Sequence, residues 1–163
     1  MEPEMNKPTI NFASLQKNHW NEQDRLNAKS VIDLVQQLMN NHDFASVEEK
    51  YKNITYTQHN RSMANGIGGV LDSLSSLVKA APEFSYDVKH IFVDGDFVTI
   101  HSHATLKAAH RGNERKGLNI IDTWKVDNGV PVEHWDAVQP LSLSMRLFNL
   151  FTGGAVRNHQ GVF

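Results

Sequence analysis

The sequence contains no cysteine, and this absence excludes disulfide bonds, thiolate metal sites and a cysteine nucleophile. The sequence also has no large excess of positive or negative charge, because it contains 16 Lys and Arg residues and 18 Asp and Glu residues. A protein that binds nucleic acid needs a basic face, so we expect no nucleic-acid partner. The chain also lacks any run of about 20 apolar residues, the length of a membrane span, and its polar start does not resemble a signal peptide. We therefore expect a cytoplasmic protein without a membrane partner.

What the sequence does contain is typical of one globular domain. It has 163 residues, of which 40% are hydrophobic and 21% charged. A chain of this length buries roughly 70% of the surface that its unfolded form exposes, so it needs no covalent staple. We divide it into a flexible N-terminal arm (1–20), a folded domain (21–140) and a C-terminal extension that is partly helical (141–163).

The first half of the domain shows helical spacing. Apolar residues recur at that spacing over 21–41, with acidic Glu22 and Asp24 in the first turn, which predicts a long amphipathic helix. A second, short helix is predicted over 45–52. A third follows the glycine-rich turn 66–69 and ends before Pro82.

Beyond Pro82 the apolar period changes from 3.6 to 2, which indicates strands. The predicted strands cover 84–92, 97–108, 118–126 and 130–139. Asp94-Gly95 and Asp127-Asn128-Gly129 supply tight hairpin turns, so the sheet should be antiparallel. The predicted fold class is therefore α+β, with the apolar helix faces covering one side of the sheet. Residues 141–151 have helical spacing, and we expect a helix that caps the domain or contacts a second copy.

Four segments together resemble a known family: residues 56–60 (YTQHN), 93–98 (VDGDFV), 121–126 (IDTWKV) and 127–136 (DNGVPVEHWD). In this order they are similar to the SnoaL-like branch of the nuclear-transport-factor-2-like superfamily, which includes polyketide cyclases that catalyse an intramolecular aldol condensation. The resemblance covers roughly 21–140. It implies a cone-shaped, strongly curved antiparallel sheet (a cystatin-like fold) wrapped around the long N-terminal helix, an internal pocket and a homodimer. Arg61 departs from the pattern, because the family usually has proline there.

Asp122 is the most informative single position. Strand alternation puts it in one row with Ile120 and Trp124, and a carboxylate in an apolar row is costly unless it is paired or neutral. Such burial is also how a fold adjusts a carboxylate for proton abstraction. In the family an aspartate near this place is a usual candidate for the base. The alternative is that Asp122 pairs with a neighbouring histidine or caps a backbone group.

His101 and His103 stand two residues apart and so share one face of their strand. The apolar row of that strand is the opposite one, with Val98 and Ile100. Either a bulge directs the histidines into the pocket, or they lie on the outer face. Two imidazoles at this spacing also suit a divalent ion, with Asp122 or Glu133 as a further ligand. That ligand set is incomplete in the sequence, and we expect no metal.

His59 and Asn60 are expected at the rim of the pocket, where Asn60 either donates to a substrate carbonyl or simply forms the turn. Tyr56 has the same strand parity as Asn60. Trp124 and Trp135 either belong to the core or flank a bound ring.

These residues support a hypothesis of cofactor-free proton abstraction next to a carbonyl, as in aldol cyclisation or isomerisation. Asp122 would be the base, His101 with His59 or Asn60 would stabilise the enolate, and His103 would contact the substrate. The substrate class is a small hydrophobic carbonyl compound. A non-catalytic small-molecule-binding module is the main alternative, and a metal-dependent enzyme is a second one. We also expect a homodimer through the outer face of the sheet, because that face would otherwise expose large apolar side chains.

Overall fold

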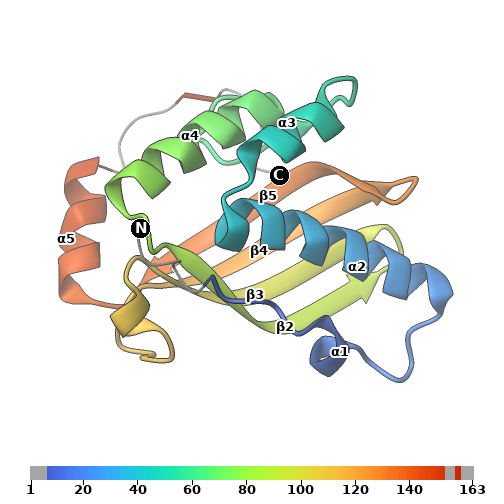
Figure 1. Ribbon diagram of the computed structural model, residues 1–163, viewed down its shortest axis with the longest axis horizontal. Helices are drawn as coiled ribbons and strands as arrows, with labels where there is room; N and C mark the ends of the chain where they lie inside the picture. The colour runs from blue at the N-terminus through green and yellow to red at the C-terminus, as the bar shows by residue number, and fades with distance from the viewer. Residues whose placement is uncertain (1–6, 153–156, 159–163) are drawn as a thin grey trace, which may run out of the picture.

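The computed structural model describes residues 7–152 and 157–158, and it consists of one curved sheet with its main helices, α2, α3 and α4, on the concave side (Figure 1). The helical segments, in chain order, are α1 (Phe12–Leu15), α2 (Glu22–Val35), η1 (Gln36–Asn41), α3 (Phe44–Tyr51), α4 (Gly66–Ala80), η2 (Ala108–His110) and α5 (Leu143–Thr152). The strands are β1 (Thr57–Gln58), β2 (Ser85–Asp94), β3 (Phe97–Thr105), β4 (Leu118–Asp127) and β5 (Val130–Pro140).

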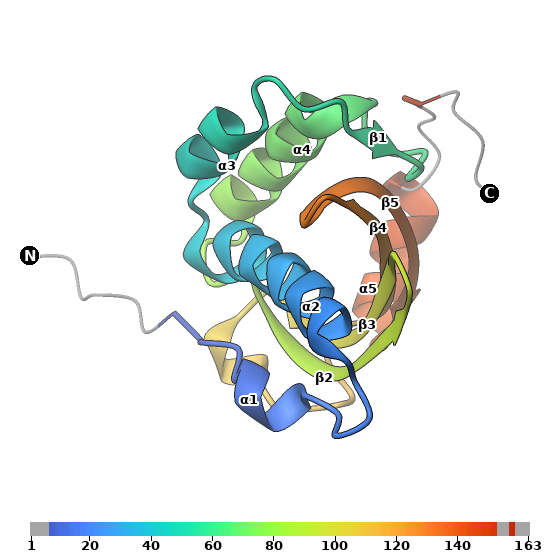
Figure 2. The ribbon, with the colours of Figure 1, turned by 90° about the vertical axis from the view of Figure 1, so that its right-hand side faces the viewer.

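The strand order in the sheet is β1-β5-β4-β3-β2. Neighbouring strands from β2 to β5 are antiparallel and joined by hairpins, whereas β1 runs parallel to β5. Figure 2 shows the sheet curling around α2, with α3 and α4 beside it. The predicted α+β class with a curved antiparallel sheet is confirmed, and the short parallel strand β1 is an element that the sequence pattern did not predict.

Helix α2 begins with a capping box. The side chain of Asn21 accepts the backbone N–H of Asp24, and the Asp24 carboxylate accepts the backbone N–H of Asn21. The buried side of the helix faces the sheet and contains Asn27, Ala28, Val31, Ile32, Leu34 and Val35. Asn27 also donates from its side chain to the carbonyl oxygen of Gly95 (3.1 Å), which ties the helix to the β2–β3 hairpin.

The last turn of this helical segment, η1, is π-helical and places Asn40 against the edge strand β2. Asn40 accepts the backbone N–H of Tyr86 (2.8 Å) and donates to the carbonyl oxygen of the same residue (3.2 Å). A buried amide thus completes two backbone hydrogen bonds that an edge strand would otherwise leave open.

The two faces of the sheet differ in what they carry. Register pairs place Ile100, Asp122 and Asp136 side by side on the inner face, towards the helices. By strand alternation, His101 and Ile121 lie on the outer face. The core fills the inner face, and the outer face exposes large apolar side chains: Phe92 (57% exposed), Phe97 (44%) and Ile121 (38%).

The N-terminal arm packs against the domain where it is described. Leu15 and Trp20 are buried, and the backbone N–H of Ile10 donates to the side chain of Gln36 (2.9 Å). The predicted division into arm, domain and extension stays a prediction, and residues 1–6, 153–156 and 159–163 lie outside the described part of the chain. Within that part, every helix is too short or too polar to cross a membrane.

Candidate functional site

Strand β1 aligns the segment after α3 with the last strand of the sheet. Thr57 pairs with Glu133 and Gln58 with His134 in parallel register. The backbone N–H of His59 continues this pairing by donating to the carbonyl oxygen of His134 (2.9 Å). Two polar segments that lie far apart in the sequence, 57–60 and 133–136, are therefore neighbours residue by residue.

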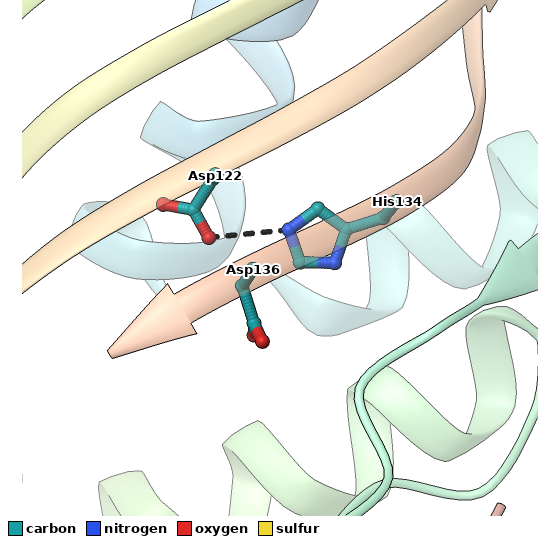
Figure 3. A group of neighbouring side chains, drawn as sticks. All are labelled: Asp122, His134 and Asp136. Atoms are coloured by element: carbon teal, nitrogen blue, oxygen red, sulfur yellow. Dashed lines mark hydrogen bonds and ion pairs between the residues drawn. The ribbon is translucent and has the colours of Figure 1, made fainter. Parts of the chain in front are cut away.

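Asp122 lies on β4 and is buried in the centre of the inner face, with 1% of its surface exposed. Its Oδ1 lies 3.1 Å from Nε2 of His134 (Figure 3). Its Oδ2 is buried and has no hydrogen-bond partner among the described residues. Burial raises the pKa of this carboxyl, the hydrogen bond and charge of His134 oppose the rise, and the nearby Asp136 adds to it.

His134 lies between Asp122 and Gln58, and all three side chains are buried. Its Nδ1 lies 3.1 Å from Oε1 of Gln58, on the opposite side of the ring from Asp122. The indole of Trp124 stacks on the imidazole, with ring centroids 4.5 Å apart. Hydrogen bonds at both nitrogens and stacking on one face hold the ring in a single orientation.

Asp136 stands next to this pair and is held by Asn60. The side-chain nitrogen of Asn60 lies 2.8 and 2.6 Å from the two carboxylate oxygens. The side-chain oxygen of Asn60 accepts the backbone N–H of Ser62 (2.8 Å), which fixes the amide so that its NH₂ group faces Asp136. Asp136 and Asn60 are half-buried and form the more exposed side of the cluster.

Tyr56 lies beside the cluster on the segment before β1. Its hydroxyl oxygen accepts a hydrogen bond from Nε1 of Trp124 (3.2 Å). Burial raises the pKa of this phenol, and the charges of Asp122 and Asp136 act in the same direction. Tyr56 therefore remains protonated and can donate its own hydrogen.

Of the other four predicted site residues, His59, His101 and Trp135 lie on the outer face by strand alternation, and His103 lines a separate cavity at the start of β2. Nε2 of His59 pairs with Glu133 (2.9 Å), and the ring stacks on Trp135 at 4.6 Å. Nε2 of His101 lies 2.6 Å from the side-chain oxygen of Asn119.

His103 is buried, and its Nε2 lies 2.8 Å from the carbonyl oxygen of Lys116. The structure thus brings together Asp122, Asn60, Tyr56 and Trp124, and it separates from them His59, His101, His103 and Trp135. The histidine beside Asp122 is His134, not the predicted His101, because no bulge reverses β3 at His101 or His103 relative to β4.

Comparison with known families and structures identifies the family and the fold. Residues 29–146 match the family described as SnoaL-like polyketide cyclase. The chain belongs to this family. No curated protein matches the chain in sequence.

Solved structures share the SnoaL-like fold at low sequence identity. A candidate polyketide cyclase from Bacillus cereus ATCC 10987 is 15% identical with a TM-score of 0.61, over 84% of this chain and 89% of that one. TsrD from Streptomyces laurentii is 16% identical with a TM-score of 0.55, over 72% and 92%. An NTF2-like protein of unknown function from Mesorhizobium loti is 21% identical with a TM-score of 0.54, over 74% and 97%. These similarities support the fold.

Three residues of the inner cluster were not predicted as functional: Gln58, His134 and Asp136. On β5 the two alternating rows are equally polar, so the sequence does not show which one is buried. The inner row of β5 could have been inferred from the inner row of β4 if the two strands paired regularly. A register shift between Lys125 and Val126 prevents this inference. The usable signal was the common parity of Gln58 and Asn60, which places both beside the inner row.

The inner cluster is the one place, among the described residues, where three potential metal ligands converge. One ligand atom from each of Asp122, His134 and Asp136 lies within 4.8 Å of the others. These three residues differ from the metal ligands considered from the sequence, which included His101 and His103. Nε2 of His134 and Oδ1 of Asp122 already bond to each other, and Asn60 engages both oxygens of Asp136. We therefore interpret the three as a hydrogen-bonded cluster, and the expectation of no metal stays a prediction.

A cavity of about 280 Å³ lies elsewhere, between the arm, the start of β2 and Arg111. Asp122 does not line this cavity. Beside Asp122 the inner face is filled by buried side chains such as Ile100 and Trp124. The described end of the C-terminal extension also lies close to the site, because Asn158 is buried and its side chain donates to the carbonyl oxygen of Gln58.

Proposed function

We propose that this SnoaL-like protein catalyses cofactor-free proton transfer next to a carbonyl group, with Asp122 as the residue that takes the proton. The supporting observation is the state of its carboxyl group. One oxygen is bonded to a histidine, the other has no partner among the described residues, and the group lies in an apolar environment that raises its pKa. A carboxyl group adjusted in this way suits general acid–base catalysis near neutral pH.

The reaction steps follow from the positions of the polar groups. Oδ2 of Asp122 removes a proton from the carbon next to the carbonyl, and the electron pair of the broken C–H bond moves to the carbonyl oxygen. The hydroxyl of Tyr56 donates a hydrogen bond to that enolate oxygen, in the role first assigned to His101. In an aldol addition, the enolate carbon attacks a second carbonyl carbon of the substrate, and Asp122 gives its proton to the alkoxide that forms. In an isomerisation, Asp122 returns the proton to a different carbon of the conjugated enolate.

The substrate that fits this arrangement is a small, largely apolar carbonyl compound. Trp124 and Tyr56 offer aromatic surfaces, whereas Asp136 repels an anionic group. Asp122 is almost fully buried, so the ligand must displace inner-face side chains, and we propose that it enters from the half-buried side at Asn60 and Asp136.

A non-catalytic binding module is the second candidate. The observation that favours it is the hydrogen bond between Asp122 and His134, which would equally serve to neutralise a buried carboxyl group in a binder. The two candidates differ in whether Asp122 is needed for chemistry or only for structure.

Exchange of α protons for deuterium separates these candidates without knowledge of the natural substrate. An aryl methyl ketone in D₂O exchanges slowly alone, and proton NMR follows the loss of its methyl signal. We expect the wild-type protein to accelerate exchange and Asp122→Asn to lower the rate by about 10²–10⁴-fold. Asp127→Asn, at the exposed end of the same strand, should leave the rate unchanged. Ketone binding by the wild type without any acceleration of exchange would favour the binding module. Equal acceleration by the wild type and Asp122→Asn would show that Asp122 is not the base.

We also propose that two copies associate through the outer face of the sheet. Phe92, Phe97 and Ile121 are exposed there, and Trp135 lies 6.2 Å from Phe97 between ring centroids. Several exposed large apolar side chains on one face of a sheet are typical of an interaction site. The active cluster lies on the opposite face, so association would leave it free.

A further inference from the structure

The side-chain amide of Gln58 has only one orientation that satisfies its neighbours. Its Oε1 lies 2.8 Å from the backbone nitrogen of Asn60, which can only donate. The atom facing Asn60 must therefore be the oxygen, and the amide nitrogen points to the sulfur of Met63 (3.9 Å). Gln58 is fully buried, so water cannot compensate for a flipped amide.

The same oxygen faces Nδ1 of His134 at 3.1 Å. Because an amide oxygen can only accept, Nδ1 must carry a hydrogen and donate it. A neutral imidazole has a hydrogen on one nitrogen only, so Nε2 of a neutral His134 faces Asp122 as an acceptor. Two acceptors cannot bond, and the 3.1 Å contact between Nε2 and Oδ1 of Asp122 requires a proton between them.

We infer that Gln58 is a positioning residue that fixes the tautomer of His134 and thereby retains one shared proton between His134 and Asp122. This inference rests on the proposed function for its catalytic meaning, although not for its geometry. The pair exists either as carboxylic acid with neutral imidazole or as carboxylate with imidazolium, and both states contain the same number of protons.

This arrangement lets Asp122 act as a base although the site retains a proton. When the shared proton moves to Nε2 of His134, Asp122 becomes a carboxylate whose Oδ2 can accept the α proton of the substrate. The imidazolium is stabilised by the hydrogen bond from its Nδ1 to Gln58. The net charge of the cluster changes only when it accepts the α proton of the substrate. Returning the proton to the product restores the original pair.

Of the other ionisable groups that the structure describes near the pair, only the charge of Asp136 acts on the shared proton. Asp136 on β5 adds negative charge next to Asp122 and favours retention of the proton. The phenols of Tyr56, before β1, and Tyr86, on β2, interact with Asp122 as well, and burial raises the pKa of both so that they remain neutral.

The tautomer is measurable by ¹⁵N NMR of labelled protein without any substrate. We expect the wild type to show a protonated Nδ1 on His134 at neutral pH. Gln58→Met keeps the volume but removes the acceptor, so that His134 can turn to the Nε2–H tautomer and bond an ionised Asp122. We expect loss of the shared proton to move to lower pH by about one to two units, the equivalent of one hydrogen bond to a charged group.

Two further variants keep the test decisive. Gln58→Glu retains an acceptor for Nδ1–H and should preserve the protonated Nδ1, whereas Gln139→Met on the exposed end of β5 should change neither NMR signal nor activity. In the α-proton exchange assay, the pH profile of Gln58→Met should shift to lower pH. This shift should equal the shift in the pH at which NMR shows loss of the shared proton. An unprotonated Nδ1 on His134 of the wild type at neutral pH would overturn the inference. Loss of the shared proton at the same pH in Gln58→Met and wild type would also overturn it. A protonated Nδ1 without any exchange activity would instead overturn the proposed function and leave the role of Gln58 intact.

Discussion

The side-chain nitrogen of Asn60 lies within hydrogen-bond distance of both carboxylate oxygens of Asp136, across the parallel pairing of β1 with β5. This contact connects the loop after β1 to the strand that carries His134. It also supplies a donor to a half-buried carboxylate whose charge acts on Asp122. The contact therefore serves both the position of the loop and the electrostatics of the site.

Replacing Asn60 by aspartate should convert this contact into a repulsion. We expect Asn60→Asp to lower the thermal midpoint by roughly 4–10 °C at neutral pH, since a hydrogen bond to a charged group is lost and two carboxylates face each other. The loss should be smaller near pH 4, where one protonated carboxyl group can donate to the other. Circular dichroism melts at both pH values test this, with Asn53→Asp, at an exposed position after α3, as control. A loss that does not change with pH would contradict the electrostatic explanation.

The raised pKa of Asp122 has a defined effect on stability. The folded state binds this proton more tightly than the unfolded state, so the contribution is favourable below the ordinary pKa of 3.8 and is lost as the pH rises through the raised value. Asparagine cannot ionise, and its amide can donate to Nε2 of His134. Asp122→Asn should therefore be at least as stable as the wild type at neutral pH, with an advantage that grows as the pH increases.

Thermal melts between pH 5 and pH 9 measure this difference, and Asp127→Asn provides the exposed control. A disadvantage of Asp122→Asn that increases with pH would show that the sign is wrong. Combined with the exchange assay, this variant distinguishes a loss of chemistry from a loss of structure, because it should be folded and inactive.

The elements with long periodic patterns were predictable from the sequence. The helical segment from Glu22 to Asn41 and the strands from Ser85 onward appear close to their predicted bounds, since spacing over ten or more residues averages out local exceptions. The inner position of Asp122 followed from its parity with Trp124. The outer position of His101 followed from the apolar row of the same strand, which was a better guide than the alternative of a bulge.

The partners of Asp122 were not predictable by the same means. Strand β1 has only Thr57 and Gln58, too few residues to show a period, and its parallel pairing with β5 depends on the whole fold. The register shift after Lys125 removes the parity of β5. Consequently the sequence indicated a paired carboxylate but not which histidine pairs with it.

Two adjacent glycines in α4 should respond to alanine in opposite ways. A Cβ on Gly69 would lie 2.0 Å from the carbonyl oxygen of Ala64, whereas a Cβ on Gly68 would have no neighbour within 4 Å. We expect Gly69→Ala to cost about 1–3 kcal/mol, because backbone atoms must move. Gly68→Ala should stabilise the protein by about 0.4–1 kcal/mol through helix propensity and reduced chain entropy. Urea denaturation measures both, and equal effects would contradict the close packing at Gly69.

Association through the outer face predicts a specific pair of results in sedimentation. The wild type should sediment as a dimer of 18.4 kDa chains at micromolar concentration, and Phe92→Asp combined with Phe97→Asp should yield the monomer. Leu26→Asp is the matched control, because Leu26 is 54% exposed on α2, away from that face. A wild-type monomer, or dissociation by Leu26→Asp alone, would contradict association through the sheet.

The amide of Asn40 also bears on aggregation. Strand β2 is one edge of the sheet, and an edge with unpaired backbone groups is a template to which a strand from another molecule can add. Asn40 occupies both the N–H and the carbonyl oxygen of Tyr86, so an incoming strand cannot pair in register past this residue. One buried side chain at the end of a π-helical turn thus occupies the position on this edge where another strand could otherwise add.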